Sequence, residues 1–266
     1  MSSRRCSNPL RGLVAALTAV LSFFSLAARA DAQQTLRIAT EGTYYPWSYK
    51  DEKGDLIGFD VDIANLLCRQ MKLTCTIAAQ DWDGIIPALL AGKYDAIVAS
   101  MAMTPARRER VAFTDKYKDV ISKFVARKGT VTDTSPQGLK GKVIAVQRGS
   151  SQNKWLDAEG YGATAIVKLY DTTEGPELDL LSGRADLMVG NMVSYYVGFF
   201  AKRPEAKDFE FVGPELKGGI LGEGAGIALR KSDTELLTKF NAALAAIRAD
   251  GSYEKLTAKY FPFKLM

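Results

Sequence analysis

Short apolar runs and amphipathic segments alternate along most of the chain. The runs TLRIAT (35–40), CTIAA (75–79) and DAIVAS (95–100) are typical of strands, whereas GFDVDIANLLCRQM (58–71) carries apolar residues at helical spacing. WDGIIPALLAGK (82–93) indicates a helix that Gly92 ends. After Gly129 the alternation begins again with GKVIAVQ, SSQNKWLDAEG, AIVKLY, PELDLLSG, ADLMVGN and VSYYVGFFAK. This order predicts α/β sheets dominated by parallel strands, with helices on both faces.

One phrase occurs twice. LLAGKYDAIVASM (89–101) and LLSGRADLMVGNM (180–192) each indicate the end of a helix, a glycine stop, an aspartate turn and a core strand. We therefore predict two similar lobes. Ser100 and Asn191 follow the two strands at their carboxyl ends, where open α/β sheets bind ligands, so both could face a cleft between the lobes. The alternative is that both are ordinary polar turn residues.

The last segments carry no second copy of this pattern. GIALRK indicates a strand, and residues 233–251 and 252–261 indicate two helices, which we expect to return to the first lobe. The predicted organisation is a first lobe at 31–118, a hinge at 119–122, a second lobe at 123–216, a return at 217–224, and the remainder of the first lobe at 225–266. Two crossings between the lobes would form the hinge.

The first thirty residues differ from the rest. The apolar run 12–27 is preceded by Arg4, Arg5 and Arg11. It is followed by Ala28-Arg29-Ala30, which has the small-x-small pattern of a cleavage site. This pattern predicts a secretory signal at 1–30, cleaved after Ala30 or Ala32. An uncleaved membrane anchor is the alternative, although the apolar run is short for a bilayer span.

Export changes how the charge and cysteines are interpreted. The formal charge is +5, and loss of the four arginines of the signal leaves about +1, so no nucleic-acid partner is expected. The absence of histidine excludes Ser-His-Asp and Cys-His catalysis and any histidine-ligated metal. Outside the signal, Cys68 and Cys75 are predicted to form a disulfide; a redox or metal pair is the alternative.

Several segments, in this order, resemble the periplasmic solute-binding proteins of polar amino-acid ABC importers, most of all the lysine/arginine/ornithine-, histidine- and opine-binding branch. They are EGTYYPWSY, GFDVDIANLLC, WDGIIPALLAGKYDAI, TPARRERVAFT, the GS after 143–147, and GIALRK with RADGSYEKLTAKYF. The resemblance implies a two-lobed periplasmic binding protein fold whose lobes close over one amino acid. It also implies a periplasmic monomer with no cofactor or metal, which delivers its ligand to an inner-membrane permease.

Arg107 is the position that the resemblance assigns to the ligand's carboxylate. Thr104 is a suitable N-cap and Pro105 suits the first helical position, so a helix N-terminus and a bidentate guanidinium would together bind an anion. The alternative, a solvated surface arginine, describes Arg108 and Arg110.

The resemblance assigns the ligand's side chain to aromatic and acidic residues. Tyr44 and Trp82 would hold its stem between flat faces, while Trp47 is expected in the core behind them. Glu41 and Asp60 would bind a distal ammonium or guanidinium. For Asp60, a carboxylate that interacts with the start of a helix is the alternative.

On the second lobe, Arg148, Ser151 and Gln152 occupy a loop and helix start that contact ligand in this family. The chain departs from relatives of ordinary α-amino-acid specificity at four positions. Glu41 stands where the lysine- and arginine-binding relatives usually have aspartate. Serines of that branch are replaced by Ala99 and Ala102, and the aspartate that neutralises the α-ammonium is replaced by Asn191. We expect Asn191 to hydrogen-bond an extra carboxylate of an opine-like ligand, with which Arg148 could pair.

Three function classes follow. The first is a binding protein that delivers a cationic or polar amino acid, or an opine-like derivative, to an importer. The second is a secreted lyase similar to cyclohexadienyl dehydratase, in which Glu41 or Asp60 would act as general acid or base. The third is a soluble ligand-sensing partner. We expect the first, and no catalytic residues.

Overall fold

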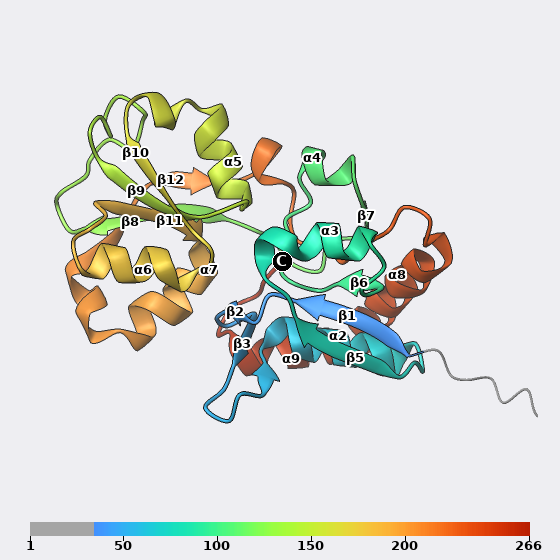
Figure 1. Cartoon of the computed structure of the whole chain (residues 1–266). Helices are drawn as coiled ribbons and strands as arrows, with labels where there is room; N and C mark the ends of the chain where they lie inside the picture. Colours follow the sequence, from blue (N-terminus) through green and yellow to red (C-terminus); the bar gives the residue numbers. More distant parts are fainter. Residues whose placement is uncertain (1–34) are drawn as a thin grey trace, which may run out of the picture. The chain divides into compact units, whose positions relative to one another are not determined.

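The computed structural model describes residues 35–266, so the predicted signal and its cleavage sites lie outside the described residues. Two five-stranded sheets organise these residues, and we call the structure around each a lobe (Figure 1). The two-lobed α/β fold class is therefore confirmed. No helix within residues 35–266 has the length and apolar character that a bilayer span requires.

The first lobe surrounds the sheet β5-β1-β6-β13-β7. Its strands and helices are β1 (Leu36–Thr40), α2 (Phe59–Gln70), β5 (Cys75–Ala79), η2 (Trp82–Gly84), α3 (Ile85–Leu90), β6 (Ala96–Ile97), α4 (Pro105–Arg108), β7 (Ala112–Phe113), β13 (Ala228–Leu229), α8 (Thr234–Ala249) and α9 (Ser252–Tyr260). A small sheet joins β2 (Thr43–Tyr44), β3 (Ser48–Lys50) and β4 (Leu56–Ile57). One core cluster lies among α2, α8 and α9 around Phe59, Leu67 and Phe240, and another lies beneath α3.

The second lobe surrounds the sheet β10-β9-β11-β8-β12. Its strands and helices are β8 (Ser122–Arg127), β9 (Val143–Gln147), α5 (Ser151–Ala158), η3 (Tyr161–Ala163), β10 (Ile166–Tyr170), α6 (Glu174–Leu181), β11 (Leu187–Asn191), α7 (Met192–Ser194), the π-helix η4 (Tyr195–Phe200), η5 (Pro204–Asp208) and β12 (Phe209–Leu216). Leu156 of α5 packs in one core cluster, whereas Leu180 of α6 and Phe199 pack in another. Helices therefore cover both faces of this sheet.

Both sheets are mixed. β1 pairs in parallel with β5 and β6, and β9 pairs in parallel with β10 and β11. β13, β8 and β12 run antiparallel to their neighbours because they are the strands that leave or enter a crossing between the lobes. The helix predicted for VSYYVGFFAK is present: the short α7 continues into a π-helix, in which the small Gly198 lies against Tyr45.

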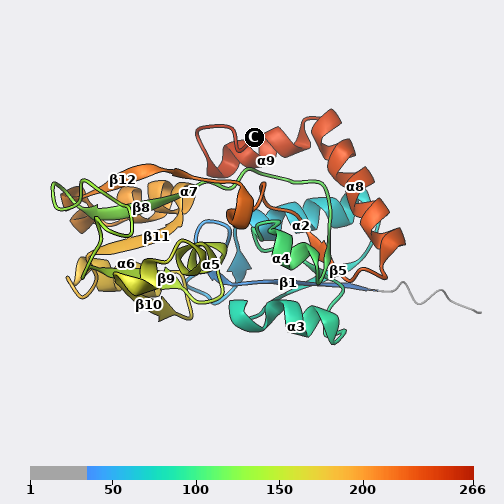
Figure 2. The ribbon, with the colours of Figure 1, turned by 90° about the horizontal axis from the view of Figure 1, so that it is seen from above.

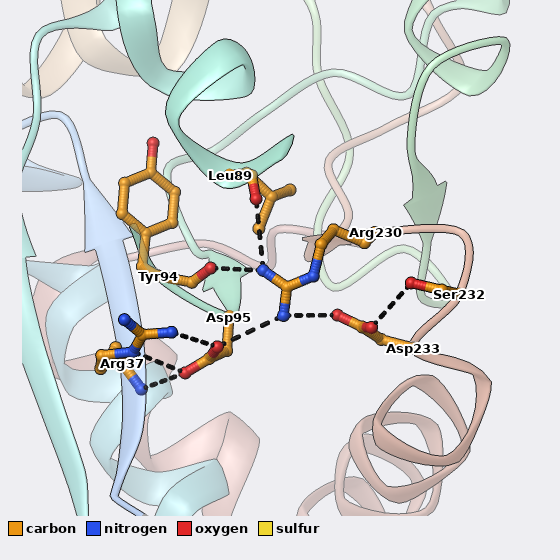
Figure 3. Close-up of polar contacts among 7 residues, drawn as sticks. All are labelled: Arg37, Leu89, Tyr94, Asp95, Arg230, Ser232 and Asp233. Atoms are coloured by element: carbon orange, nitrogen blue, oxygen red, sulfur yellow. Dashed lines mark hydrogen bonds and ion pairs between the residues drawn. The ribbon is translucent and has the colours of Figure 1, made fainter. Parts of the chain in front are cut away.

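The repeated phrase occupies equivalent places in the two lobes. Gly92 and Gly183 adopt the left-handed conformation after α3 and α6. Asp95 then accepts hydrogen bonds from the backbone N–H and guanidinium of Arg37, and Asp186 accepts them from the backbone of Val143 and the side chain of Lys142. In the first lobe the network is larger (Figure 3).

Arg230 makes that network larger. Its guanidinium donates to the carbonyls of Leu89 and Tyr94 and pairs with Asp95, which ties β13 to the end of α3. The C-terminal segments are thereby fixed to the first lobe, at the opposite strand ends from those where Ser100 and Asn191 lie.

Two chain segments connect the lobes and run side by side (Figures 1 and 2). Ser122 pairs with Leu216 at one point and Lys118 bridges Ala225 at another, both in antiparallel register. The predicted hinge limits at 119–122 and 217–224 fall within these segments. The limits themselves remain predictions.

The predicted disulfide is present between Cys68, in the last turn of α2, and Cys75, the first residue of β5. It closes a short loop, and we expect it to stabilise the fold by roughly 2–3 kcal/mol, mainly through the unfolded chain. Replacement of both cysteines by alanine should lower the free energy of unfolding by that amount in urea denaturation of oxidised protein. Under reducing conditions the difference between wild type and variant should vanish. A variant as stable as oxidised wild type would contradict the expectation.

Candidate functional site

Two pockets lie where residues of both lobes meet. One, of about 870 Å³, is lined by Trp82, Arg107, Arg148 and Ser151 among others. The second, of about 540 Å³, is lined by Tyr44, Gln152 and Asn191 among others. Ser150 lines both, so the pockets adjoin at the N-terminus of α5. Seven of the twelve predicted ligand-binding residues thus line this pair of pockets. The other five, described below, do not line either pocket.

Arg107 is placed by its own helix as the sequence predicts. Thr104 caps α4 by accepting from the backbone N–H of Arg107 at 3.2 Å, and Pro105 takes the first helical position. The guanidinium donates to the carbonyl of Ala102 at 3.0 Å and, across to the second lobe, to that of Gly149 at 3.3 Å. Its carbon lies 4.9 Å from the ring centroid of Trp82.

Arg107 is a cation without an acidic partner: no aspartate or glutamate of residues 35–266 forms an ion pair with it. Removal from water lowers its pKa to about 10, so it stays charged at neutral pH. A cation held by carbonyl dipoles beside an aromatic face favours a carboxylate ligand, which would supply the missing negative charge.

Glu41 is buried at the end of β1 and is only partly satisfied. Its Oε1 accepts from Gln147 Nε2, in the second lobe, at 2.6 Å and from Thr43 at 3.3 Å, whereas its Oε2 is buried with no hydrogen-bond partner. Burial is the largest cause that raises the pKa of Glu41, to about 7, and the charge of Asp60 adds to it. The carboxylate therefore lacks a cation, which a ligand could provide.

Asp60 was predicted to bind a distal ammonium or guanidinium of the ligand, but its side chain is buried inside the first lobe and lines neither pocket. It is fully buried in α2, its Oδ2 accepts from Ser100 Oγ at 2.8 Å, and its Oδ1 accepts from Tyr117 Oη at 2.8 Å. Ser100 has a left-handed backbone (φ 49°), which directs its own N–H to the same Tyr117 hydroxyl. Asp60 thus sits behind Ser100. Ligand contact by either residue stays a prediction.

The predicted alanines lie in the core of the first lobe, whereas the two predicted aromatic contacts line the pockets. Ala99 and Ala102 are buried in the two core clusters of the first lobe. Tyr44 and Trp82 are both half-buried, but they line different pockets. Trp47 is fully buried in the core, as expected.

On the second lobe, Asn191 ends β11 and caps α7. Its Oδ1 accepts from the backbone N–H of Ser194 at 3.0 Å and from the Ser194 hydroxyl at 3.4 Å. Because a backbone N–H can only donate, the atom opposite it must be the amide oxygen, and the NH₂ group is left for the pocket that Asn191 lines. Asn191 is thus a hydrogen-bond donor toward the cleft.

The remaining second-lobe predictions have partners within their lobe. Arg148 is exposed and its Nε pairs with Asp171 at 3.1 Å. Gln152 donates to Ser122 Oγ at 2.7 Å, which ties α5 to the start of β8. Ser151 is buried, within 3.4 Å of Gln152 Oε1.

Three residues that line the second pocket were not predicted as contacts: Gln147, Ser150 and Ser194. Gln147 and Ser194 both contact the opposite lobe, since Trp47 Nε1 donates to Ser194 Oγ at 2.6 Å. Each follows or ends a strand at its carboxyl end, and this is the only sequence signal that could have indicated them. Among the described residues, no group of Cys, Asp and Glu is arranged to hold a metal ion.

Residues 36–263 match the model of the bacterial extracellular solute-binding proteins, family 3. The chain belongs to this family. Among relatives, the L-arginine-binding protein of Pseudomonas aeruginosa is 43% identical, over 87% of this chain and 90% of its own. The lysine/arginine/ornithine-binding periplasmic protein of Escherichia coli is 39% identical, over 95% of each chain. A solved ancestral arginine-binding protein bound to arginine matches with a TM-score of 0.78 at 36% identity, over 85% of this chain and 98% of that chain.

The predicted branch of this solute-binding family is confirmed, since histidine-binding and octopine-binding periplasmic proteins also match. These relatives are binding proteins by name. An ancestral amino-acid-binding protein described as a precursor of cyclohexadienyl dehydratase shares the fold, so the fold alone does not decide between binding and catalysis.

Glu41 gives this solute-binding protein a pH-dependent stability. Between pH 4.5 and about 7 the folded state holds a proton on Glu41 that the unfolded chain lacks, so the free energy of unfolding should fall as pH rises through this window. The fall should be on the order of 3 kcal/mol relative to Glu41→Gln, which cannot titrate. Denaturant titrations of both proteins across the window measure it. Glu254→Gln, an exposed control on α9, should track wild type; parallel curves for Glu41→Gln and wild type would contradict the assignment.

Proposed function

We propose that this protein binds a cationic or polar amino acid, or an opine-like derivative, in the periplasm and delivers it to the permease of an ABC importer. The observation that supports this most is Arg107, a guanidinium at the junction of the lobes with carbonyl partners and no acid. The names of the relatives agree with it: they bind arginine, lysine, ornithine, histidine or octopine.

The ligand's carboxylate would pair with Arg107. The stem of its side chain would lie against Trp82 or Tyr44, which line the two adjoining pockets. A distal ammonium or guanidinium would then satisfy Glu41 Oε2, the buried oxygen that lacks a partner. Each unsatisfied group of the site thereby meets a group of opposite character in one ligand.

The part of the site that would face the ligand's amine does not complement the α-ammonium of a free amino acid. Asn191 offers a donor, and an α-ammonium is also a donor, so the two do not complement each other. A carboxylate attached near the amine would accept from Asn191. This complementarity favours an N-carboxyalkylated amino acid, the opine type, over free arginine.

We also propose that the protein is a monomer whose lobes close over the ligand at the hinge of residues 119–122 and 217–224. The bonds from Arg107 to Gly149 and from Gln147 to Glu41 join the lobes directly and would be lost on opening. A lyase on this fold would use Glu41, with its pKa of about 7, as acid or base. We propose binding rather than catalysis because the relatives named above, at 43% and 39% identity, are binding proteins.

Arg107→Ala should abolish binding without unfolding the protein. A ligand carboxylate buried without its guanidinium costs about 2–5 kcal/mol, which is 30-fold or more in affinity. Calorimetric titration with arginine, ornithine and an octopine-type derivative measures the loss. Arg108→Ala, an exposed neighbour, should bind as wild type does. Near-normal affinity in Arg107→Ala would overturn the carboxylate assignment.

Asn191→Asp should shift preference toward free arginine, lysine or ornithine. The carboxylate keeps the cap on Ser194, so the fold should tolerate the change, but it attracts an α-ammonium and repels a second carboxylate. We expect the ratio of affinities for arginine and an N-carboxyalkyl arginine to change by about tenfold or more, since charged hydrogen bonds exceed neutral ones by roughly 1–2 kcal/mol. Asn241→Asp, a distant amide in α8, is the control. An unchanged ratio would make Asn191 a turn residue only.

A further inference from the structure

Lys118 is a lysine in the interior of the protein. Its side chain is fully buried, although lysine is almost never buried without a partner. Its ammonium lies 3.6 Å from the ring centroid of Trp47 and has no hydrogen-bond partner. Its backbone carbonyl accepts from Ala225, on the second crossing, so the residue is held where the two crossings meet.

The charge that Lys118 opposes is Asp60. Asp60 is also fully buried, and its two hydrogen bonds come from neutral hydroxyls, those of Ser100 and Tyr117. Burial raises the pKa of Asp60, and Lys118 is the cation that counteracts the rise. Reciprocally, burial lowers the pKa of Lys118 to about 8 and the charge of Asp60 opposes that change. Each charge lowers the free-energy cost of keeping the other group ionised inside the protein.

The pair changes the charge that a ligand meets. Glu41 and Asp60 are close enough for the charge of Asp60 to raise the pKa of Glu41. Without Lys118, two carboxylates would act on a ligand's distal cation. With Lys118 present, its positive charge opposes that of Asp60, so a ligand's distal cation meets a weaker negative field than two unopposed carboxylates would give.

We propose that Lys118 is a specificity-determining residue that acts as the counter-ion of Asp60 and so disfavours ligands that carry an excess positive charge. This rests on the proposed function and narrows it. An arginine-type ligand that carries a second carboxylate has two negative and two positive groups, so its net charge is zero. Free arginine brings one excess positive charge, which the cation of Lys118 opposes.

The test is a charge cycle on Lys118 and Asp60. Lys118→Met removes the cation with little change in shape, and Asp60→Asn removes the acid. Affinities for arginine and for citrulline, its neutral isostere, are measured by calorimetry near neutral pH, where Lys118 is charged, together with those for an N-carboxyalkyl arginine. Arginine preference over citrulline should rise about tenfold in Lys118→Met and fall by a similar factor in Asp60→Asn, because a buried charge is weakly screened. The double variant should return to the wild-type ratio.

Lys116→Met is the matched control: this lysine is exposed, pairs with Asp119 and should leave the ratio unchanged. If Lys118→Met does not fold, the double variant and Asp60→Asn still decide the matter, since the first leaves no unpaired charge. Equal weakening of all ligands in Lys118→Met and Asp60→Asn, with no change of ratio, would show a structural role and overturn the proposal. Wild type that binds none of the ligands would instead overturn the proposed function.

Discussion

Charge that has no partner of opposite sign is the constraint on which this structure depends. Arg107 is held at the junction of the lobes by carbonyl oxygens of Ala102 and Gly149, and Glu41 is held there by an amide and a hydroxyl. Neutral partners orient a charge but do not cancel it, so each remains costly until an opposite charge arrives. A protein that must bind and release a zwitterion needs this arrangement, because groups already paired with each other would have to separate first.

The fold was largely predictable because its signals are local. Two α/β lobes are indicated by the glycine stops, the periodic apolar residues and the repeated sequence segment. The position of Arg107 in the first turn of a helix follows from Thr104 and Pro105, which lie just before it in the sequence. The antiparallel strands at the crossings were not predicted, because β7 and β13 are two residues long and their pairing joins residues more than a hundred apart. Within the π-helix, Gly198 lies against Tyr45, a residue that is equally remote in sequence.

The role of a site residue was predictable where neighbouring residues in the sequence determine it. It was less predictable where the role depends on burial by residues that are distant in the sequence. Asp60 carries a helix-start signal and an acidic side chain, but nothing in its segment shows that Ser100 and Tyr117 cover it. Lys118 lies in DKYKD, a run of charged residues typical of a solvated surface, yet it is buried together with its neighbour Tyr117. Its importance comes from Trp47 and Asp60, both nearly sixty residues or more away in sequence.

Specificity and movement share residues in this protein. Tyr117 and Lys118, which surround Asp60, lie immediately before the proposed hinge, and Ser122, which accepts from Gln152, begins the strand after it. Ser194 accepts from the indole N–H of Trp47 in the opposite lobe while its hydroxyl donates to Asn191, so the amide proposed to contact the ligand's amine end is oriented by a residue that joins the lobes. In a two-state closure, a ligand shifts the equilibrium only by the difference of its interactions in the two states. In the proposed site that difference would be concentrated in Arg107, Glu41 and Asn191, because each of them bonds to the opposite lobe or to a residue that does.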